Sequence, residues 1–112
     1  RDFTYVDDVL QVNERALLTK NPEALNTVYN IARGERTTLN ELAEILRDAL
    51  SAYDPAIAAV CPEHGPARKG DVAHSLADIS KAVRLLGYTR FPVREGLRNA
   101  AAWYWENRLT LR

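Results

Sequence analysis

The segment from Arg68 to Gly87 constrains the chain most, because it joins a polar loop directly to a short helix. The first four residues place a cation, a glycine and a carboxylate in close succession. The Arg68 guanidinium can bind a phosphate through paired N–H donors, and Gly70 permits a positive φ or the close approach of a ligand. The Asp71 carboxylate can accept hydrogen bonds from a pair of sugar hydroxyls. Asp78 is a suitable N-cap for a helix that ends at Gly87, so the segment predicts a ligand-binding loop followed by a helix.

Two earlier stretches also predict helices. Asp7 or Asp8 offers an N-cap for a first helix that extends to about Thr19. The apolar side of this helix consists of Val9, Leu10, Ala16 and Leu17. Thr38 and Glu41 form a capping box, in which each side chain binds a free backbone N–H group at the start of a second helix. The apolar face of the second helix has helical spacing and consists of Leu39, Leu42, Leu46, Leu50 and Tyr53.

Short strands are predicted between the helices. Patterns of apolar residues indicate strands at residues 1–6, 28–32, 56–60 and 72–76. A last helix is predicted over residues 94–108, and its expected buried residues are Val93, Leu97, Ala101, Tyr104 and Trp105. This order of elements predicts an α/β fold, a mixed small lobe of about four helices with short strands and no interior domain boundary.

Three sets of residues, in this order, resemble motifs of extended short-chain dehydrogenases/reductases that act on nucleotide sugars. They are Arg1–Asp8 (RDFTYVDD), Tyr29–Gly34 (YNIARG), and a third set formed by Arg68–Asp71 (RKGD), Ala77–Ala82 (ADISKA) and Leu85–Tyr88 (LLGY). Over nearly its whole length the chain is similar to the NAD-dependent epimerase/dehydratase family, and most of all to UDP-N-acetylglucosamine and UDP-glucose 4-epimerases.

The resemblance implies a substrate-binding role for three residues. Arg1 and Arg68 would clamp the diphosphate of a UDP-sugar, and Asp71 would bind the hydroxyls of its ribose. Spacing alone leaves other interpretations open. The two arginines fit solvated surface positions, and Asp71 fits a turn aspartate that accepts hydrogen bonds from nearby backbone N–H groups.

The sequence lacks the two motifs that supply cofactor binding and catalysis in this family. Its glycines stand at positions 34, 65, 70, 87 and 96, so a glycine-rich dinucleotide-binding turn is absent. No tyrosine stands four residues before a lysine, so the Tyr-x-x-x-Lys pair is absent too. We therefore expect NAD to be the cofactor of a longer parent protein. This chain alone is expected to bind no cofactor, to contain no catalytic residue and to be inactive.

The chain contains no methionine and opens on Arg1, inside a motif, which predicts that it is a piece of a longer protein. Residues 1–112 would then be the C-terminal substrate-binding lobe, and the N-terminal NAD-binding (Rossmann) domain would lie outside the chain. Faces that this domain covers in the parent would be exposed here, or would support self-association.

The charge balance argues against several kinds of partner. With 15 basic and 15 acidic residues the formal net charge is +0, which gives no general surface for nucleic acid or membrane. No apolar run approaches the roughly 20 residues of a membrane span, and no signal peptide is visible, which predicts a cytoplasmic location. Cys61 and His64 have metal-like spacing but no second pair of ligands, so no metal site is expected.

Together these observations predict the UDP-hexose-binding portion of an NAD-dependent sugar 4-epimerase, an isomerase. Two alternatives stay open. One is a portion of a nucleotide-sugar dehydratase or decarboxylase of the same superfamily. The other is a stand-alone, non-catalytic domain that acts by binding or by self-association.

Overall fold

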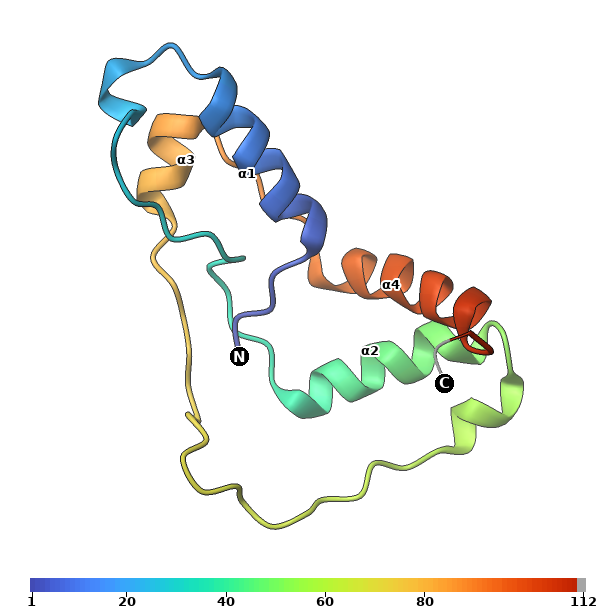
Figure 1. Cartoon of the computed structure of the whole chain (residues 1–112). Coiled ribbons are helices and arrows are strands. Elements are labelled where there is room, and N and C mark those ends of the chain that lie inside the picture. The colour runs from blue at the N-terminus through green and yellow to red at the C-terminus, as the bar shows by residue number, and fades with distance from the viewer. Residues whose placement is uncertain (111–112) are drawn as a thin grey trace.

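The computed structural model describes residues 1–110, which form four α-helices and two short 3₁₀ helices. These are α1 (Val6–Leu18), α2 (Leu39–Ser51), α3 (Ser80–Leu86), α4 (Val93–Asn107), η1 (Pro22–Ala24) and η2 (Pro55–Ala59). Figure 1 shows two groups of helices: α1 packs with α3 at one end of the molecule, and α2 packs with α4 at the other. The segment between η2 and α3 runs around the outside (Figure 1).

The predicted α/β class was wrong, because the described residues contain no β-strand and the structure is helical. A strand needs a neighbour with which it exchanges a ladder of hydrogen bonds. Arg1 and Thr37 exchange one such pair: the Arg1 amino group donates to the Thr37 carbonyl (2.8 Å), and Thr37 N–H donates to the Arg1 carbonyl (2.9 Å). In an antiparallel ladder the next bonded pair would be Phe3 and Glu35, and among the described residues no backbone hydrogen bond joins those two, so the pairing does not extend into a ladder.

Residues 56–60, predicted to be a strand, lie largely within η2 instead. The Asp54 carboxylate accepts a hydrogen bond from Ala56 N–H (2.9 Å), and Pro55 at the first helical position has a φ already suited to a helix. The N-cap and the proline therefore outweigh the apolar run that follows them. The segments 1–5, 28–32 and 72–76 have no regular secondary structure.

Helix α1 begins at Val6, so Asp7 and Asp8 lie inside its first turn. Tyr5 occupies the N-cap position and makes no side-chain capping bond, so the prediction of an aspartate N-cap was wrong. Asp8 instead is only 2% exposed and accepts a hydrogen bond from Phe91 N–H (2.9 Å). Its carboxylate thus ties α1 to the segment that precedes α4.

Helix α2 starts with the predicted capping box. The Thr38 hydroxyl accepts a hydrogen bond from Glu41 N–H (3.1 Å), and the Glu41 carboxylate accepts one from Thr38 N–H (2.7 Å). The backbone and hydroxyl hydrogen bonds from Thr38 hold the pKa of the Glu41 carboxyl below its ordinary value. The start of α2 is therefore fixed by residues only three positions apart.

Helix α3 ends at Gly87 as predicted, with a φ of +63° at that residue. The guanidinium of Arg15, from α1, donates to the backbone carbonyls of Leu86 (3.3 Å) and Gly87. A cation at this position is favourable, because the last carbonyls of a helix have no partner within it. At the other end of the helix, Ile79 occupies the N-cap position and makes no side-chain capping bond, so the prediction that Asp78 is the N-cap was wrong by one residue. The Asp78 carboxylate still accepts a hydrogen bond from Ser80 N–H (2.9 Å).

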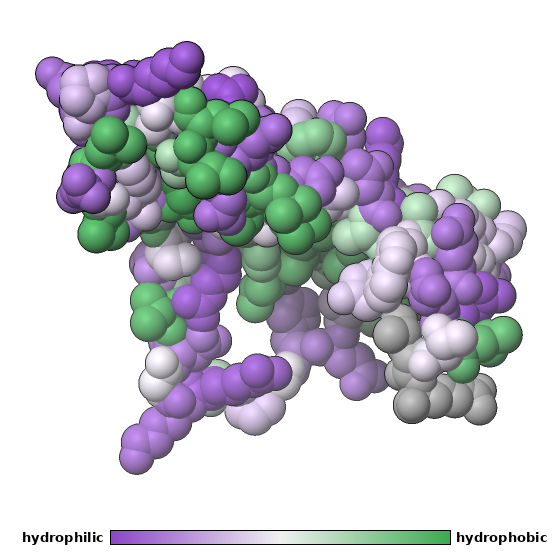
Figure 2. Space-filling model, turned by 45° about the horizontal axis from the view of Figure 1, so that its top comes forward, coloured by the Kyte–Doolittle hydropathy of each residue, from purple (hydrophilic) through white to green (hydrophobic). Residues whose placement is uncertain are grey.

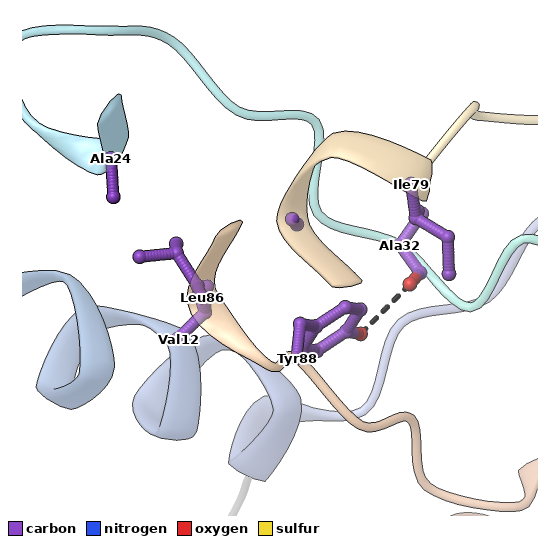
Figure 3. Close-up of a cluster of buried hydrophobic side chains, with 7 residues drawn as sticks. Val12, Ala24, Ala32, Ile79, Leu86 and Tyr88 are labelled. Carbon is purple, nitrogen blue, oxygen red and sulfur yellow. Dashed lines mark hydrogen bonds between the residues drawn. The ribbon is translucent and has the colours of Figure 1, made fainter. Parts of the chain in front are cut away.

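The main hydrophobic core lies around α1, α3 and η1 (Figure 3). Its buried residues are Val12, Ala24, Ala32, Ile79, Ala82, Leu86 and Tyr88. The Tyr88 hydroxyl donates a hydrogen bond to the Ala32 carbonyl (2.8 Å), the interaction drawn in Figure 3. Burial, together with the nearby carboxylates of Asp8 and Asp2, raises the pKa of Tyr88 to about 12. The phenol is therefore a neutral donor that joins two segments of the core.

Helices α2 and α4 pack against each other at the second end of the molecule. Their buried positions include Ile45, Gly96 and Ala101. The rings of Tyr53 and Trp105 stack with their centroids 5.5 Å apart. Tyr104, predicted to be buried, is 58% exposed. A Cβ at Gly96 would lie 3.0 Å from the ring of Tyr5, so this glycine allows the N-terminal segment to pack against α4.

The molecule is more open than a typical domain of this length. Its radius of gyration is 17.2 Å, whereas about 13 Å is usual for this number of residues. Figure 2 shows hydrophobic residues at the surface of the end that carries α1 and α3. The apolar side of α1 is largely exposed, with exposed fractions of 41% for Val9, 60% for Leu10 and 82% for Leu17, because this helix packs through Val12. Within the part of the chain that the structure describes, no helix has both the length and the apolar character to cross a membrane.

Replacing Tyr88 by phenylalanine should lower the free energy of unfolding by about 1–3 kcal/mol, because the Ala32 carbonyl loses its buried donor while the ring is kept. Urea denaturation followed by circular dichroism measures this change. Tyr104→Phe is the matched control, since Tyr104 is exposed, and should change the same quantity by less than about 0.5 kcal/mol. Equal stability of the two variants would contradict the role of the Tyr88 hydroxyl.

The raised pKa of Tyr88 predicts a loss of stability at high pH. An unfolded tyrosine loses its proton near pH 10, whereas the pKa of Tyr88 in the folded chain is about 12. Between these values the unfolded state binds fewer protons than the folded state, so the free energy of unfolding falls as the pH rises from about 10 to about 12. Tyr88→Phe should lack this part of the decrease, and parallel curves for the two proteins would refute the prediction.

Candidate functional site

The carboxylate of Asp2 joins segments that are far apart in the sequence. Its two oxygens accept hydrogen bonds from the backbone N–H groups of Arg33 (2.9 Å), Gly34 (3.0 Å) and Ala77 (3.3 Å). The Asp2 N–H group donates to the Ser75 hydroxyl (3.3 Å). Asp2 therefore holds together the N-terminal segment, the turn before α2 and the segment before α3.

These three segments border a cavity of about 470 Å³ at the start of α2, called here the α2 cavity. Arg1 lines it from the N-terminal segment, residues 36–40 from the start of α2, and residues 71–74 from the segment before α3. Its polar side chains are those of Arg1, Arg36, Thr37, Thr38, Asn40, Asp71 and His74. Two guanidinium groups beside hydroxyl, amide and carboxylate groups suit an anionic ligand that also carries hydroxyls.

Residues 68–71 form a turn at the edge of the α2 cavity. The Asp71 N–H group donates to the Arg68 carbonyl (3.2 Å), and Gly70 has a φ of +83°, which confirms the positive φ that the sequence allowed. This hydrogen bond, with a positive φ at the third residue, is the pattern of a type II turn. Such a turn keeps the Cα atoms of its first and last residues within about 7 Å, so Arg68 and Asp71 extend from neighbouring points.

The structure brings two of the three predicted site residues into contact. Arg1 and Asp71 are 70 positions apart in the sequence, form an ion pair and both line the α2 cavity. Their side chains are 33% and 50% exposed, so water reaches the pair. Arg68 is exposed and lies outside the lining of the cavity, although its turn carries Asp71 into it.

Five further polar residues of the cavity were not predicted as site residues: Arg36, Thr37, Thr38, Asn40 and His74. Thr38 was identified only as a helix cap, and no spacing in the sequence points to the others. Nε2 of His64 lies 3.1 Å from Oδ1 of Asn40, so the loop after η2 also reaches the start of α2.

A larger hollow, of about 690 Å³, lies along α3. Its charged lining residues are Asp78, Arg84 and Arg90, and none of the three predicted site residues lines it. The α2 cavity is therefore the candidate site, because it is where the predicted residues converge.

A comparison with protein-family models found no match for this chain. Comparison with individual proteins shows that the chain is a distant relative of nucleotide-sugar 4-epimerases over nearly its whole length. It is 32% identical over 110 residues to a Methanocaldococcus jannaschii protein provisionally named UDP-glucose 4-epimerase, covering 98% of this chain and 32% of that protein. It is 30% identical over 104 residues to the dTDP-L-rhamnose 4-epimerase of Burkholderia thailandensis, covering 92% of this chain and 26% of that enzyme.

A third relative is the UDP-glucuronate 4-epimerase of Thermodesulfobacterium geofontis, 30% identical over 109 residues, which are 96% of this chain and 31% of that enzyme. The chain thus spans about a third or less of the length of these relatives. The names of the three give different sugars but one reaction type, epimerisation at carbon 4.

Replacing Asp2 by asparagine should disrupt the α2 cavity, because a neutral amide offers one acceptor oxygen where the carboxylate uses two for three N–H groups. We expect the free energy of unfolding to fall by about 2 kcal/mol and the Arg33, Gly34 and Ala77 amides to exchange hydrogen faster. Asp7→Asn is the control, since Asp7 is exposed on α1. Unchanged exchange at the three amides in the Asp2 variant would show that they do not depend on this carboxylate.

Proposed function

We propose that this chain is the UDP-sugar-binding portion of an NAD-dependent nucleotide-sugar 4-epimerase. In this proposal Arg1 and Arg68 bind the diphosphate, and Asp71 binds the ribose hydroxyls. The supporting observation is the meeting of Arg1 and Asp71 at one cavity, with Arg68 at the other end of the same turn. The distant relationship to 4-epimerases over nearly the whole chain gives the reaction class.

The ion pair between Arg1 and Asp71 is weak enough to be exchanged for a ligand. An exposed pair contributes about 0.2–1 kcal/mol, whereas a hydrogen bond from a charged group contributes about 1.5–3 kcal/mol. A phosphate that replaces Asp71 as the partner of the Arg1 guanidinium would leave the Asp71 carboxylate free to accept hydrogen bonds from two hydroxyls. This single exchange of partners would leave Arg1 bound to the diphosphate and Asp71 bound to the ribose of a nucleoside diphosphate.

The residues of this chain do not fit NAD. A dinucleotide site needs a strand, a glycine-rich turn and a helix in succession, and residues 1–110 contain no strand. We therefore assign NAD and the catalytic base to the rest of a longer protein, in which they would invert carbon 4 of the sugar. This chain would contribute binding and orientation of the substrate.

The exposed side of α1 supports a place within a larger protein. Val9, Leu10 and Leu17 lie on that side, and a second domain would cover them. The same surface would suit the alternative of a stand-alone domain that self-associates. Among the enzyme alternatives, the relatives are named as 4-epimerases, which favours epimerisation over a dehydratase or a decarboxylase.

Replacing Arg68 by alanine in the full-length protein that contains this chain should weaken UDP binding roughly 10- to 100-fold, because a charge-assisted contact to the diphosphate is lost. Isothermal titration calorimetry with UDP measures the affinity. Lys69→Ala removes a neighbouring charge from the same exposed turn and should bind UDP like the wild type. An Arg68 variant with unchanged affinity would remove Arg68 from the proposed clamp.

A further inference from the structure

Arg36 is an arginine of the α2 cavity that forms no ion pair within residues 1–110. Within residues 1–110, ion pairs join Arg1 to Asp71, Arg33 and Arg90 to Glu35, and Arg94 to Asp48. Arg36 takes part in none of these pairs. It lines the α2 cavity and also a second hollow, whose lining includes the carboxylates of Glu41 and Glu44. Because Arg36 forms an ion pair with neither glutamate, an anion that enters the α2 cavity would not have to break such a pair to bind it.

The backbone that carries Arg36 is fixed next to that of Arg1. Thr37 follows Arg36, is 6% exposed and exchanges two backbone hydrogen bonds with Arg1 (2.8 and 2.9 Å). Arg1 and Arg36 therefore line the same cavity from neighbouring backbone positions. The first turn of α2 borders the cavity as well, and the partial positive charge of a helix start adds to theirs.

We propose that Arg36 is a phosphate-binding residue of the nucleotide-sugar site, an inference that rests on the proposed function. Arg36 binds a phosphate without breaking an ion pair, whereas Arg1 first has to leave Asp71. Arg36 therefore makes the first contact. The phosphate held there then competes with Asp71 for Arg1, and the Asp71 carboxylate is released toward the ribose. The site thus uses three arginines, of which two, Arg1 and Arg36, line the cavity before the ligand enters.

The test compares UDP with uridine, which lacks the phosphates, as ligands of the full-length protein. Arg36→Ala should weaken UDP binding about 10-fold and leave uridine binding unchanged. It should also reduce the dependence of UDP affinity on salt, because one charge contact is lost. Arg36→Lys, which keeps the charge but loses the paired donors, should fall between the alanine variant and the wild type. Arg98→Ala, on the exposed face of α4, is the matched control and should bind UDP normally.

The outcomes separate this inference from the function on which it rests. If the wild type binds UDP and Arg68→Ala weakens binding while Arg36→Ala does not, the role of Arg36 is overturned and the proposed function stands. If Arg36→Ala weakens UDP and uridine equally, Arg36 does not act on the phosphates and the inference is again overturned. If the wild type binds no UDP, the proposed function itself fails.

Discussion

The carboxylate of Asp2 is the constraint on which the rest of the structure depends. It accepts three backbone hydrogen bonds from two distant segments, and so takes the place of the ladder that a pair of strands would supply. Hydrogen bonds to a charged group contribute about 1.5–3 kcal/mol each, whereas a bond between neutral groups contributes about 0.5–1.5 kcal/mol. Its charge, after burial and the charge of Asp8, also raises the pKa of Tyr88 in the core.

The candidate site forms where the N-terminal segment meets the segment before α3, at Asp2. Arg1 precedes Asp2, and Asp71 precedes Ser75 and Ala77, which Asp2 binds. Holding the two segments together at Asp2 places the two charged side chains within reach of each other. The chemistry of the site, cations with a carboxylate and hydroxyls, suits recognition of an anionic ligand.

The sequence predicted those features that depend on residues within a few positions of one another. The Thr38 and Glu41 capping box, the end of α3 at Gly87 and the positive φ of Gly70 are of this kind. The strands failed because a strand exists only with a partner, which no local pattern supplies. The family resemblance was confirmed by distant relatives, and it marked Arg1 and Asp71 before the structure brought them together. Arg36 was missed, because its place in the cavity arises only from the pairing of its neighbour Thr37 with Arg1.

The turn that carries Arg68 and Asp71 lies within residues 60–74, all of which are exposed. Packing therefore does little to order this segment, and fixing the backbone of each residue costs about 1–2 kcal/mol in conformational entropy. When a ligand binds the turn, the conformational entropy lost depends on how many residues of the loop already contact the rest of the chain. His64, which contacts Asn40, is one such residue. Affinity in this site would then be governed as much by the preorganisation of the loop as by the groups that touch the ligand.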